Sequence, residues 1–328
     1  MQRILFITYS RVGDCILSSG LLDELTRRYP SARVTVCCGP ASAALFQAHP
    51  RLEELIVIRK QRYNRHWAAL WRRLVLRRWT AVVDLRRSAL PWLLWAKHRA
   101  TPSKAEANEH RVLTLARTLD AQPPPAPTVW TSPQDQTEAD RLIGSARPVL
   151  AVGPTANWPG KVWPPERFAE LVQRLIAPGG ALAGASVFVT GGPNEIDQAQ
   201  PVIDAVPSEQ LRAGVGLSLP TTAAALQRCR LFIGNDSGLM HLAAAAGTPV
   251  LGLFGPTKDV VYGPWSRHSR VVRTPESYQE LVGQPGFQYK TAGTQMTNLT
   301  VDTVEHAAHA LLDETASTVE TGAATHQE

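Results

Sequence analysis

The sequence predicts an α/β protein with two doubly wound parallel sheets. Short apolar runs alternate with segments of helical periodicity, and this alternation restarts after a proline-rich connector. The chain has 328 residues, about twice the length of a typical domain of ~150 residues. Hydrophobic residues make up 44% of the chain and charged residues 19%, which excludes a disordered or collagen-like protein.

The first half alternates strands with a helix. Four apolar runs have the length of buried strands: 4–7, 34–37, 55–58 and 81–85. Leu17, Leu21 and Leu25 recur every four residues as one helix face, which ends before Pro30. The prolines of 123–127 indicate a stiff connector. We therefore expect a first domain over 1–145 and a second over 146–315.

The second half repeats the pattern. Strands are expected at 149–152, 187–189, 231–233 and 250–253. A helix after Pro165 carries its apolar residues at i, i+3, i+4, i+7 and i+8, from Phe168 to Ile176. Further helices are expected from Thr221, as the cap, to Cys229, at 239–246, and through 304–312 with Asp302 and Glu305 as a capping pair. Residues 316–328 are small and polar, and we expect them to be disordered.

Charge is divided unequally between the halves. Residues 1–145 hold 22 basic and 12 acidic side chains, whereas 146–328 hold 12 basic and 16 acidic. An anionic partner is therefore expected on the first half. The four cysteines lack a CxxC pair, and no signal peptide or apolar run of ~20 residues is present, so we expect a reduced, cytoplasmic protein.

Polar residues follow the predicted strands where ligands bind to parallel sheets. Asp14 either caps a helix or acts as a general base. Lys161 is either a solvated side chain or a cation for an anionic group. The glycines before Glu195 allow either close approach of a phosphate to the backbone or an ordinary tight turn. The segment from Asp236 to His241 begins a helix, and the free N–H groups at a helix start can bind an anion. No metal, Walker or dinucleotide motif is present.

These motifs resemble those of the heptosyltransferases of glycosyltransferase family 9. The resemblance is carried by Arg11-Val12-Gly13-Asp14, Lys161-Val162-Trp163-Pro164, the run from Asn235 to Ala245, and Phe254-Gly255-Pro256-Thr257, and it extends in order over residues 3–315. Family members are inverting enzymes of bacterial lipopolysaccharide core assembly. The resemblance implies the GT-B fold, with two facing Rossmann-like domains and a C-terminal helix that crosses back onto the first. The first domain would bind the acceptor, and the second would bind ADP-heptose.

The resemblance also implies roles for single residues. Asp14 would be the general base, and Lys161 would meet the donor diphosphate and sugar. Glu195 would hold the adenosine ribose, and Asp236 would contact the heptose. The remaining expected donor-binding residues are Thr155, Ser237, Gly238 and His241. No cofactor or metal is expected, because the nucleoside diphosphate leaves as a stable anion that Lys161 and the helix start can stabilise.

The acceptor side departs from the family pattern. Asp84-Leu85-Arg86-Arg87 stands where many relatives have Asp-Leu-Gln-Gly. A second departure lies in the Lys161 motif, where Val162 replaces a common Arg or His. A basic cluster over 59–78 either solvates a helix or grips an anionic glycolipid. Its expected acceptor contacts are Arg59, Lys60, Arg62 and Arg65. Tryptophans there and in 91–95 either pack in the core or rest on the inner membrane surface.

The sequence therefore predicts an inverting transferase that moves heptose from ADP-heptose to an anionic lipopolysaccharide inner-core acceptor. It would be cytoplasmic, with peripheral contact to the inner membrane, and no nucleic-acid partner is expected. One alternative is a transferase of the same family with another nucleotide sugar or glycan. The other is a non-catalytic protein that binds a sugar nucleotide or a polyanion.

Overall fold

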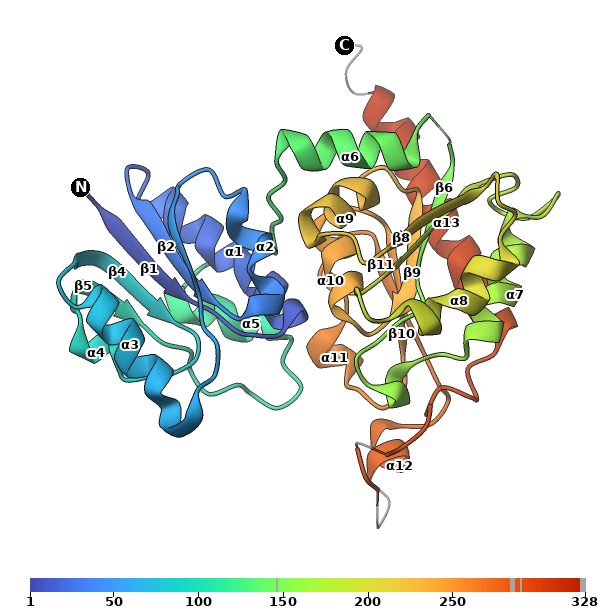
Figure 1. The fold of residues 1–328 in the computed structure, drawn as a ribbon. Coiled ribbons are helices and arrows are strands. Elements are labelled where there is room, and N and C mark those ends of the chain that lie inside the picture. The colour runs from blue at the N-terminus through green and yellow to red at the C-terminus, as the bar shows by residue number, and fades with distance from the viewer. Residues whose placement is uncertain (146, 284–286, 290, 325–328) are drawn as a thin grey trace. The chain divides into compact units, whose positions relative to one another are not determined.

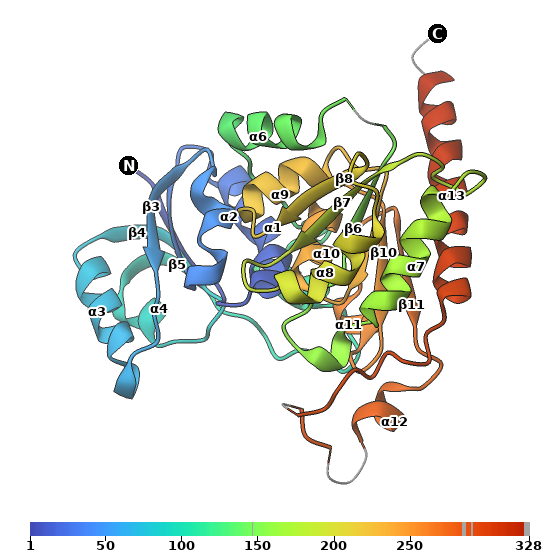
Figure 2. The same cartoon turned by 45° about the vertical axis from the view of Figure 1, so that its right-hand side comes forward.

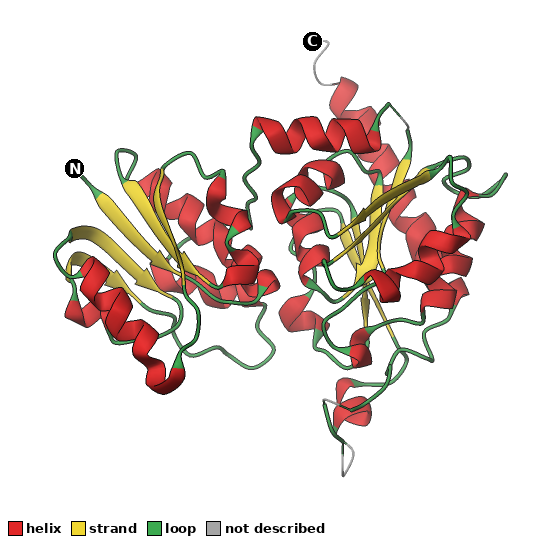
Figure 3. Cartoon of the chain, viewed as in Figure 1, coloured by secondary structure: helices red, strands yellow, loops and turns green. Residues whose placement is uncertain are grey.

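The chain forms two compact units, Met1–Ser132 and a second that begins at Pro133. The computed structural model describes residues 1–145, 147–283, 287–289 and 291–324. Figure 1 labels the helices and strands, which alternate along the chain, and Figure 3 shows that both units combine strands with helices. All strand pairs are parallel, as the alternation predicts.

The first unit is built on a five-stranded sheet in the order β3-β2-β1-β4-β5. Its strands are β1 (Arg3–Ile7), β2 (Arg33–Cys38), β3 (Leu52–Val57), β4 (Arg78–Asp84) and β5 (Trp95–Ala100). The α-helices between and after them are α1 (Val12–Arg28), α2 (Ala44–Gln47), α3 (Arg65–Leu74), α4 (Leu90–Leu93) and α5 (Arg111–Ala116). Because β1 lies at the centre of this sheet, the loop after it stands at the middle of the carboxyl edge.

The described part of the second unit holds a six-stranded sheet in the order β11-β10-β9-β6-β7-β8. Its strands are β6 (Val149–Gly153), β7 (Ser186–Gly191), β8 (Leu211–Val215), β9 (Leu231–Asn235), β10 (Val250–Phe254) and β11 (Ser269–Arg273). Its α-helices are α6 (Pro133–Ile143), α7 (Pro165–Ile176), α8 (Ile196–Ala205), α9 (Leu219–Leu226), α10 (Gly238–Ala245), α11 (Asp259–Tyr262), α12 (Tyr278–Val282) and α13 (Val301–Ala324).

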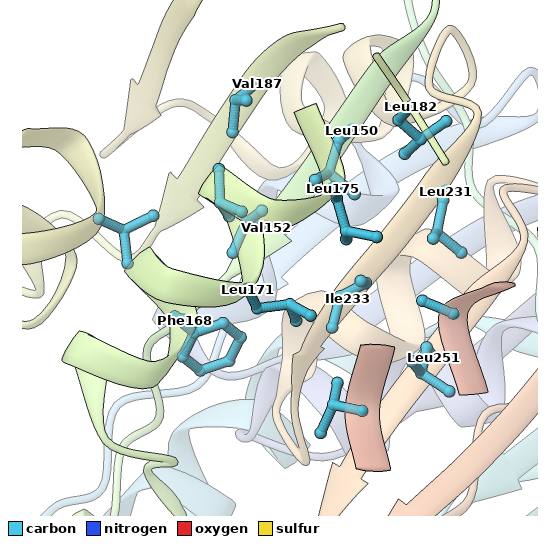
Figure 4. Packing of buried hydrophobic residues seen from close by; sticks show 14 of the residues in the cluster. Leu150, Val152, Phe168, Leu171, Leu175, Leu182, Val187, Leu231, Ile233 and Leu251 are labelled. Carbon is cyan, nitrogen blue, oxygen red and sulfur yellow. The ribbon is translucent and has the colours of Figure 1, made fainter. Parts of the chain in front are cut away.

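One apolar cluster holds the second unit together. The predicted face of α7 is buried against β6, β7 and β9, and Figure 4 shows Phe168, Leu171 and Leu175 beside the strand residues Leu150 and Ile233. Residues of α13 join the same cluster, among them Val304, Ala308 and Leu311. These side chains are less than 2% exposed, so burial of apolar surface supplies most of the force that fixes the sheet and its carboxyl-edge loops.

Two expectations about the chain's organisation need correction. The unit boundary lies between Ser132 and Pro133 rather than after residue 145, because α6 packs on α9 of the second unit. The tail is helical rather than disordered through Ala324, where α13 ends, and residues 325–328 lie outside the described part. The last helix, α13, packs on α7, β10 and β11, since its apolar face belongs to the core of the second unit.

Two helix caps also differ from the prediction. Ser218, not Thr221, is the N-cap of α9, and its side chain accepts from the Thr221 backbone N–H. Asp302 and Glu305 do not form a capping pair at α13; both accept from Arg174 of α7, while Thr300 accepts from the Thr303 N–H. In each case the residue just before the first helical turn takes the capping role.

Within the described residues, no helix combines the length and the apolar character that a membrane crossing requires. The four cysteines are buried thiols without a disulfide.

Candidate active site

The carboxyl edge of the second sheet gathers most of the predicted donor residues. Parallel strands β6, β7, β9 and β10 all end at this edge, and their loops carry Thr155, Lys161, Glu195 and Asp236. Strand register sets Gly153 of β6 opposite Gly234 of β9, so the loops that follow these strands leave the sheet side by side. The fold therefore brings together residues that are up to 81 positions apart in the chain, from Thr155 to Asp236.

Lys161 and Asp236 form an ion pair at this edge. The Lys161 Nζ lies 3.1 Å from Asp236 Oδ2, and the two side chains are 15% and 8% exposed. A cation this poorly solvated attracts an anion more strongly than a surface lysine does. Asp236 orients the ammonium group and supplies a carboxylate that can accept hydroxyl protons of a bound sugar.

Asn235 fastens the loop that carries Lys161. Its side-chain Oδ1 accepts from the Trp163 N–H at 3.0 Å, and its Nδ2 donates to the Pro154 carbonyl at 2.8 Å. Asn235 is fully buried, so both hydrogen bonds are shielded from water. One amide thus ties both ends of the loop after β6 to the end of β9.

Glu195 lies next to Thr155. The Thr155 hydroxyl donates to Glu195 Oε2 at 2.6 Å, and the Gly192 N–H donates to the same oxygen at 2.8 Å. A Cβ at position 192 would stand 3.0 Å from the Glu195 carboxyl carbon, so glycine is what lets the carboxylate turn back onto its own loop. The other carboxylate oxygen, Oε1, accepts no hydrogen bond from the described residues and can bind a diol such as a ribose.

The start of α10 offers hydrogen-bond donors to an anion. Ser237 is the N-cap, but its side chain makes no capping hydrogen bond. The hydroxyl oxygens of Ser237 and of Thr257, which follows β10, are buried and have no hydrogen-bond partner among the described residues. Gly238 opens the helix, and His241 lies in its first turn at 5% exposure. Helix N–H groups and these hydroxyls suit the oxygens of a phosphate.

Asp14 stands in the first unit, in the first turn of α1 directly after the loop from β1. The helix N-cap is Arg11, so Asp14 is not the helix cap, which was one of the two roles that the sequence left open for it. Its side chain is partly exposed at the carboxyl edge of the first sheet. A carboxylate in this position is favoured by the helix dipole and remains accessible to a substrate.

Tyr9 and Arg111 lie on the same edge as Asp14. Arg111 Nη2 donates to the Tyr9 hydroxyl at 2.6 Å, and its guanidinium lies over the Tyr9 ring at 5.2 Å. Burial raises the pKa of Tyr9 to about 12, although the charge of Arg111 acts in the opposite direction. Tyr9 therefore stays protonated at neutral pH. The pair was not predicted, because 102 residues separate its members and neither belongs to a motif.

The loop after β4 is closed by Asp84. This buried carboxylate accepts from the Arg86 N–H at 2.9 Å, the Ser88 N–H at 2.7 Å and the Ser88 hydroxyl at 2.5 Å. The turn requires a positive φ of 57° at Arg87. Arg86 lies over the Trp67 ring at 5.0 Å, and its Nη1 is buried without a partner among the described residues. The departure from the family pattern thus adds a guanidinium near the carboxyl edge of the first sheet.

The four predicted acceptor contacts are all exposed. Arg59 and Lys60 follow β3 at the carboxyl edge, and Arg62 and Arg65 lie in the segment that leads into α3. Other members of the basic cluster have a structural role. Arg73 and Arg77 both donate to Glu54, and although burial opposes ionisation of this carboxyl, their hydrogen bonds lower its pKa.

Comparison with known proteins shows to which family this chain belongs. A model of glycosyltransferase family 9 (heptosyltransferase) matches residues 67–288, more than half of the chain. The chain belongs to glycosyltransferase family 9. It is therefore a glycosyltransferase enzyme.

Relatives of this family 9 enzyme match it over nearly its whole length. The lipopolysaccharide heptosyltransferase 2 of Salmonella typhimurium is 26% identical over 368 aligned residues, which cover 95% of this chain and 99% of that protein. The solved structure of E. coli ADP-heptose lps heptosyltransferase II has a TM-score of 0.73 at 23% identity and covers 96% of this chain and 100% of its own. The family 9 glycosyl transferase from Veillonella parvula has a TM-score of 0.77 at 22% identity, over 95% of this chain and 98% of that one. The predicted fold of two parallel-sheet domains is confirmed.

Proposed function

We propose that this family 9 enzyme transfers a heptose from ADP-heptose to a lipopolysaccharide inner-core acceptor, with inversion at the anomeric carbon. The observation that carries the proposal is the set of groups at the carboxyl edge of the second sheet. A poorly solvated Lys161–Asp236 pair, the Glu195–Thr155 pair and the start of α10 together offer partners for a sugar, a ribose and a diphosphate. The names of the full-length relatives support heptose as the transferred sugar.

The donor would lie along this edge. Glu195, with Thr155 beside it, would accept hydrogen bonds from the ribose hydroxyls. The diphosphate would meet the N–H groups that begin α10 at Ser237 and Gly238, and His241 would line the same pocket. Lys161 would neutralise the charge that grows on the diphosphate as the bond to the sugar breaks, which stabilises the transition state more than the ground state. Asp236 would accept from a heptose hydroxyl.

The acceptor would be activated by Asp14. Its carboxylate would take the proton of the acceptor hydroxyl while that oxygen attacks the anomeric carbon from the face opposite the diphosphate. The new carbon–oxygen bond forms as the bond to ADP breaks, ADP leaves as an anion, and the proton passes from Asp14 to water. One displacement of this kind inverts the anomeric configuration, and it needs no second carboxylate as an acid.

The first unit would bind the anionic acceptor. It holds 21 basic and 9 acidic side chains in residues 1–132, and the exposed Arg59, Lys60, Arg62 and Arg65 would contact phosphates or acidic sugars. We place the reaction in the cytoplasm, with the enzyme in peripheral contact with the inner membrane where a lipid-linked acceptor is found.

Turnover with defined substrates tests the proposal. The purified protein with ADP-heptose and a heptose-deficient core acceptor should release ADP in step with acceptor loss, and NMR of the product should show the inverted anomer. Thermal unfolding with a panel of nucleotide sugars provides a second measurement, since a ligand that binds the native state raises its melting temperature. Stabilisation by UDP- or GDP-sugars alone would show that the donor is another nucleotide sugar. Binding of ADP-heptose without turnover would show that the protein binds the sugar nucleotide but does not catalyse transfer.

A further inference from the structure

An exposed apolar patch lies at the amino-terminal end of the first sheet. It consists of Trp92, Leu93, Trp95 and Leu76, which are 72%, 56%, 69% and 93% exposed. Trp95 begins β5 and pairs with Arg78, the first residue of β4, which Leu76 precedes by two positions. The four side chains therefore belong to one end of the sheet. Large apolar side chains grouped on a surface mark a contact with a partner or a membrane.

The segment that presents the patch is held rigidly. Leu90 and Leu94 are buried anchors at either end of α4, each 3% exposed. The Arg99 guanidinium donates to the carbonyls of Pro91 and Leu94, and Trp71 of α3 donates its indole N–H to the Leu93 carbonyl. The packing of α4 against α3, β4 and β5 is visible in Figures 1 and 2. These contacts hold the backbone that carries the exposed side chains. Less conformational entropy is therefore lost when the side chains bind a partner.

Basic residues surround the apolar patch. An open groove of about 610 Å³ beside it is lined by Trp92, Trp95, Arg78, Lys97 and Arg99, among others. The charged side chains that line this groove are all basic, namely Arg78, Lys97 and Arg99. The surface beside the patch therefore attracts an anionic partner.

We infer that the apolar patch docks the enzyme on an anionic lipid bilayer. Tryptophan favours the interface between headgroups and acyl chains, and neighbouring lysine and arginine attract anionic headgroups. A protein partner with an acidic rim would also satisfy the charge. Two exposed tryptophans beside two exposed leucines favour a bilayer, because insertion between lipid headgroups needs no partner surface of matching shape.

The apolar patch is separate from the carboxyl edge of the first sheet, where Asp14 lies. It lies at the start of β5, whereas Asp14 and the loop after β4 lie at the carboxyl edge, about 16 Å along strands of this length. A bilayer can therefore occupy the patch while the edge with Asp14 stays open. The inference rests on the membrane contact of the proposed function but not on the identity of the donor, because vesicle binding is measured without any sugar nucleotide.

Vesicle co-sedimentation of the full chain tests the inference. The protein should bind vesicles that contain phosphatidylglycerol at low salt, bind more weakly at high salt, and bind pure phosphatidylcholine least. Trp92→Ser with Trp95→Ser should weaken binding at least about tenfold, because two apolar insertions are lost. Lys97→Gln should weaken it about fivefold, the effect of one basic residue at such a surface.

Controls separate docking from folding and from self-association. The matched variant Val260→Ser with Tyr278→Ser removes exposed apolar side chains from the second unit and should bind as the wild type does. Far-UV circular dichroism and the melting temperature should be equal for all variants. The inference is overturned if the wild type ignores phosphatidylglycerol vesicles, if the double tryptophan variant binds them equally well, or if sedimentation velocity instead shows a dimer that this variant abolishes.

Discussion

Asn235 shows how much of the site depends on a residue that touches no substrate in our account. Its amide satisfies a backbone N–H and a backbone carbonyl that would otherwise be buried without partners. We predict that Asn235→Ala lowers the stability of the second unit by about 2–4 kcal/mol, since each unpaired buried group costs about 1–3 kcal/mol. It should also weaken ADP binding, because the loop with Lys161 loses its tie to β9.

Calorimetric titration with ADP and urea unfolding measure both effects. Asn157→Ala, an exposed asparagine of the same loop, is the matched control and should leave both unchanged. Equal stability of the Asn235 and Asn157 variants would contradict the role of the amide.

His49 predicts a dependence of stability on pH. Its ring is buried edge-on to Trp130 at 4.7 Å, and its Nδ1 accepts from the Arg51 N–H. Burial, and then the charge of Arg51, lowers the pKa of His49 from 6.5 to about 4. Because the folded pKa lies below the unfolded one, the stabilisation is complete above pH 6.5 and is lost as the pH falls through 4, by up to about 3 kcal/mol.

Urea unfolding across this pH range measures the loss. His49→Phe keeps an aromatic ring and removes the titrating group, so its stability should fall less steeply with acid than that of the wild type. His306→Phe, an exposed position on α13, should keep the wild-type slope. Parallel slopes for the wild type and His49→Phe would rule out this cause.

At the residue scale, the sequence indicated the groups that stand in short motifs and missed those that depend on tertiary contact. Lys161 and Asp236 were each predicted from the motif in their own loop. The sequence gives no sign that these two residues, 75 positions apart, form an ion pair. The same holds for Tyr9 and Arg111. A motif records local spacing, whereas the partners of a buried charge are set by which strands are neighbours.

At the scale of elements, the strands that the sequence missed all lie at sheet edges. β5, β8 and β11 are outermost in their sheets. Their exposure alternates or is mixed, as in β5, where only Ala96 and Ala100 are even partly buried. A strand with one unpaired side need not be apolar on both faces, so it lacks the continuous apolar run that marks β1, β6 and β9.

The cap of α9 gives a prediction at the same scale. Ser218 accepts from the Thr221 N–H at 3.2 Å, and Thr221 instead donates its hydroxyl to Asp135 of α6. Ser218→Ala should lower stability by about 1 kcal/mol, because one N–H of the first turn loses its acceptor. Ser208→Ala, at an exposed position, should be neutral in the same thermal unfolding experiment. A neutral Ser218→Ala would show that water replaces the cap fully.

At the scale of the whole molecule, the sequence predicted two α/β units but placed their boundary late. The proline-rich connector suggested a break, yet α6 follows it and packs on α9, with Arg228 donating to Asp140 at 2.7 Å. A polar helix whose buried residues are Ala139 and Ile143 has too few apolar positions to reveal its unit. Only the contact with α9 decides where it belongs.

Truncation tests the corrected boundary. A fragment that begins at residue 133 should be more stable than one that begins at 146 by about 2–4 kcal/mol, because the latter loses the burial of the apolar side chains of α6. Differential scanning calorimetry of the two fragments measures the difference. Equal melting temperatures of the two fragments would show that α6 is part of the connector and not of the second unit.

The most direct test of the account is the rate of heptose transfer when Asp14 is replaced. Asp14→Asn should lower kcat by about 10²–10⁴, the usual effect of losing a positioned base, while calorimetry should show ADP binding unchanged. Asp23→Asn, an exposed position on the same helix α1, should retain wild-type turnover. Full activity of Asp14→Asn would contradict the assignment of this carboxylate as the proton acceptor and, with it, the displacement described for this enzyme.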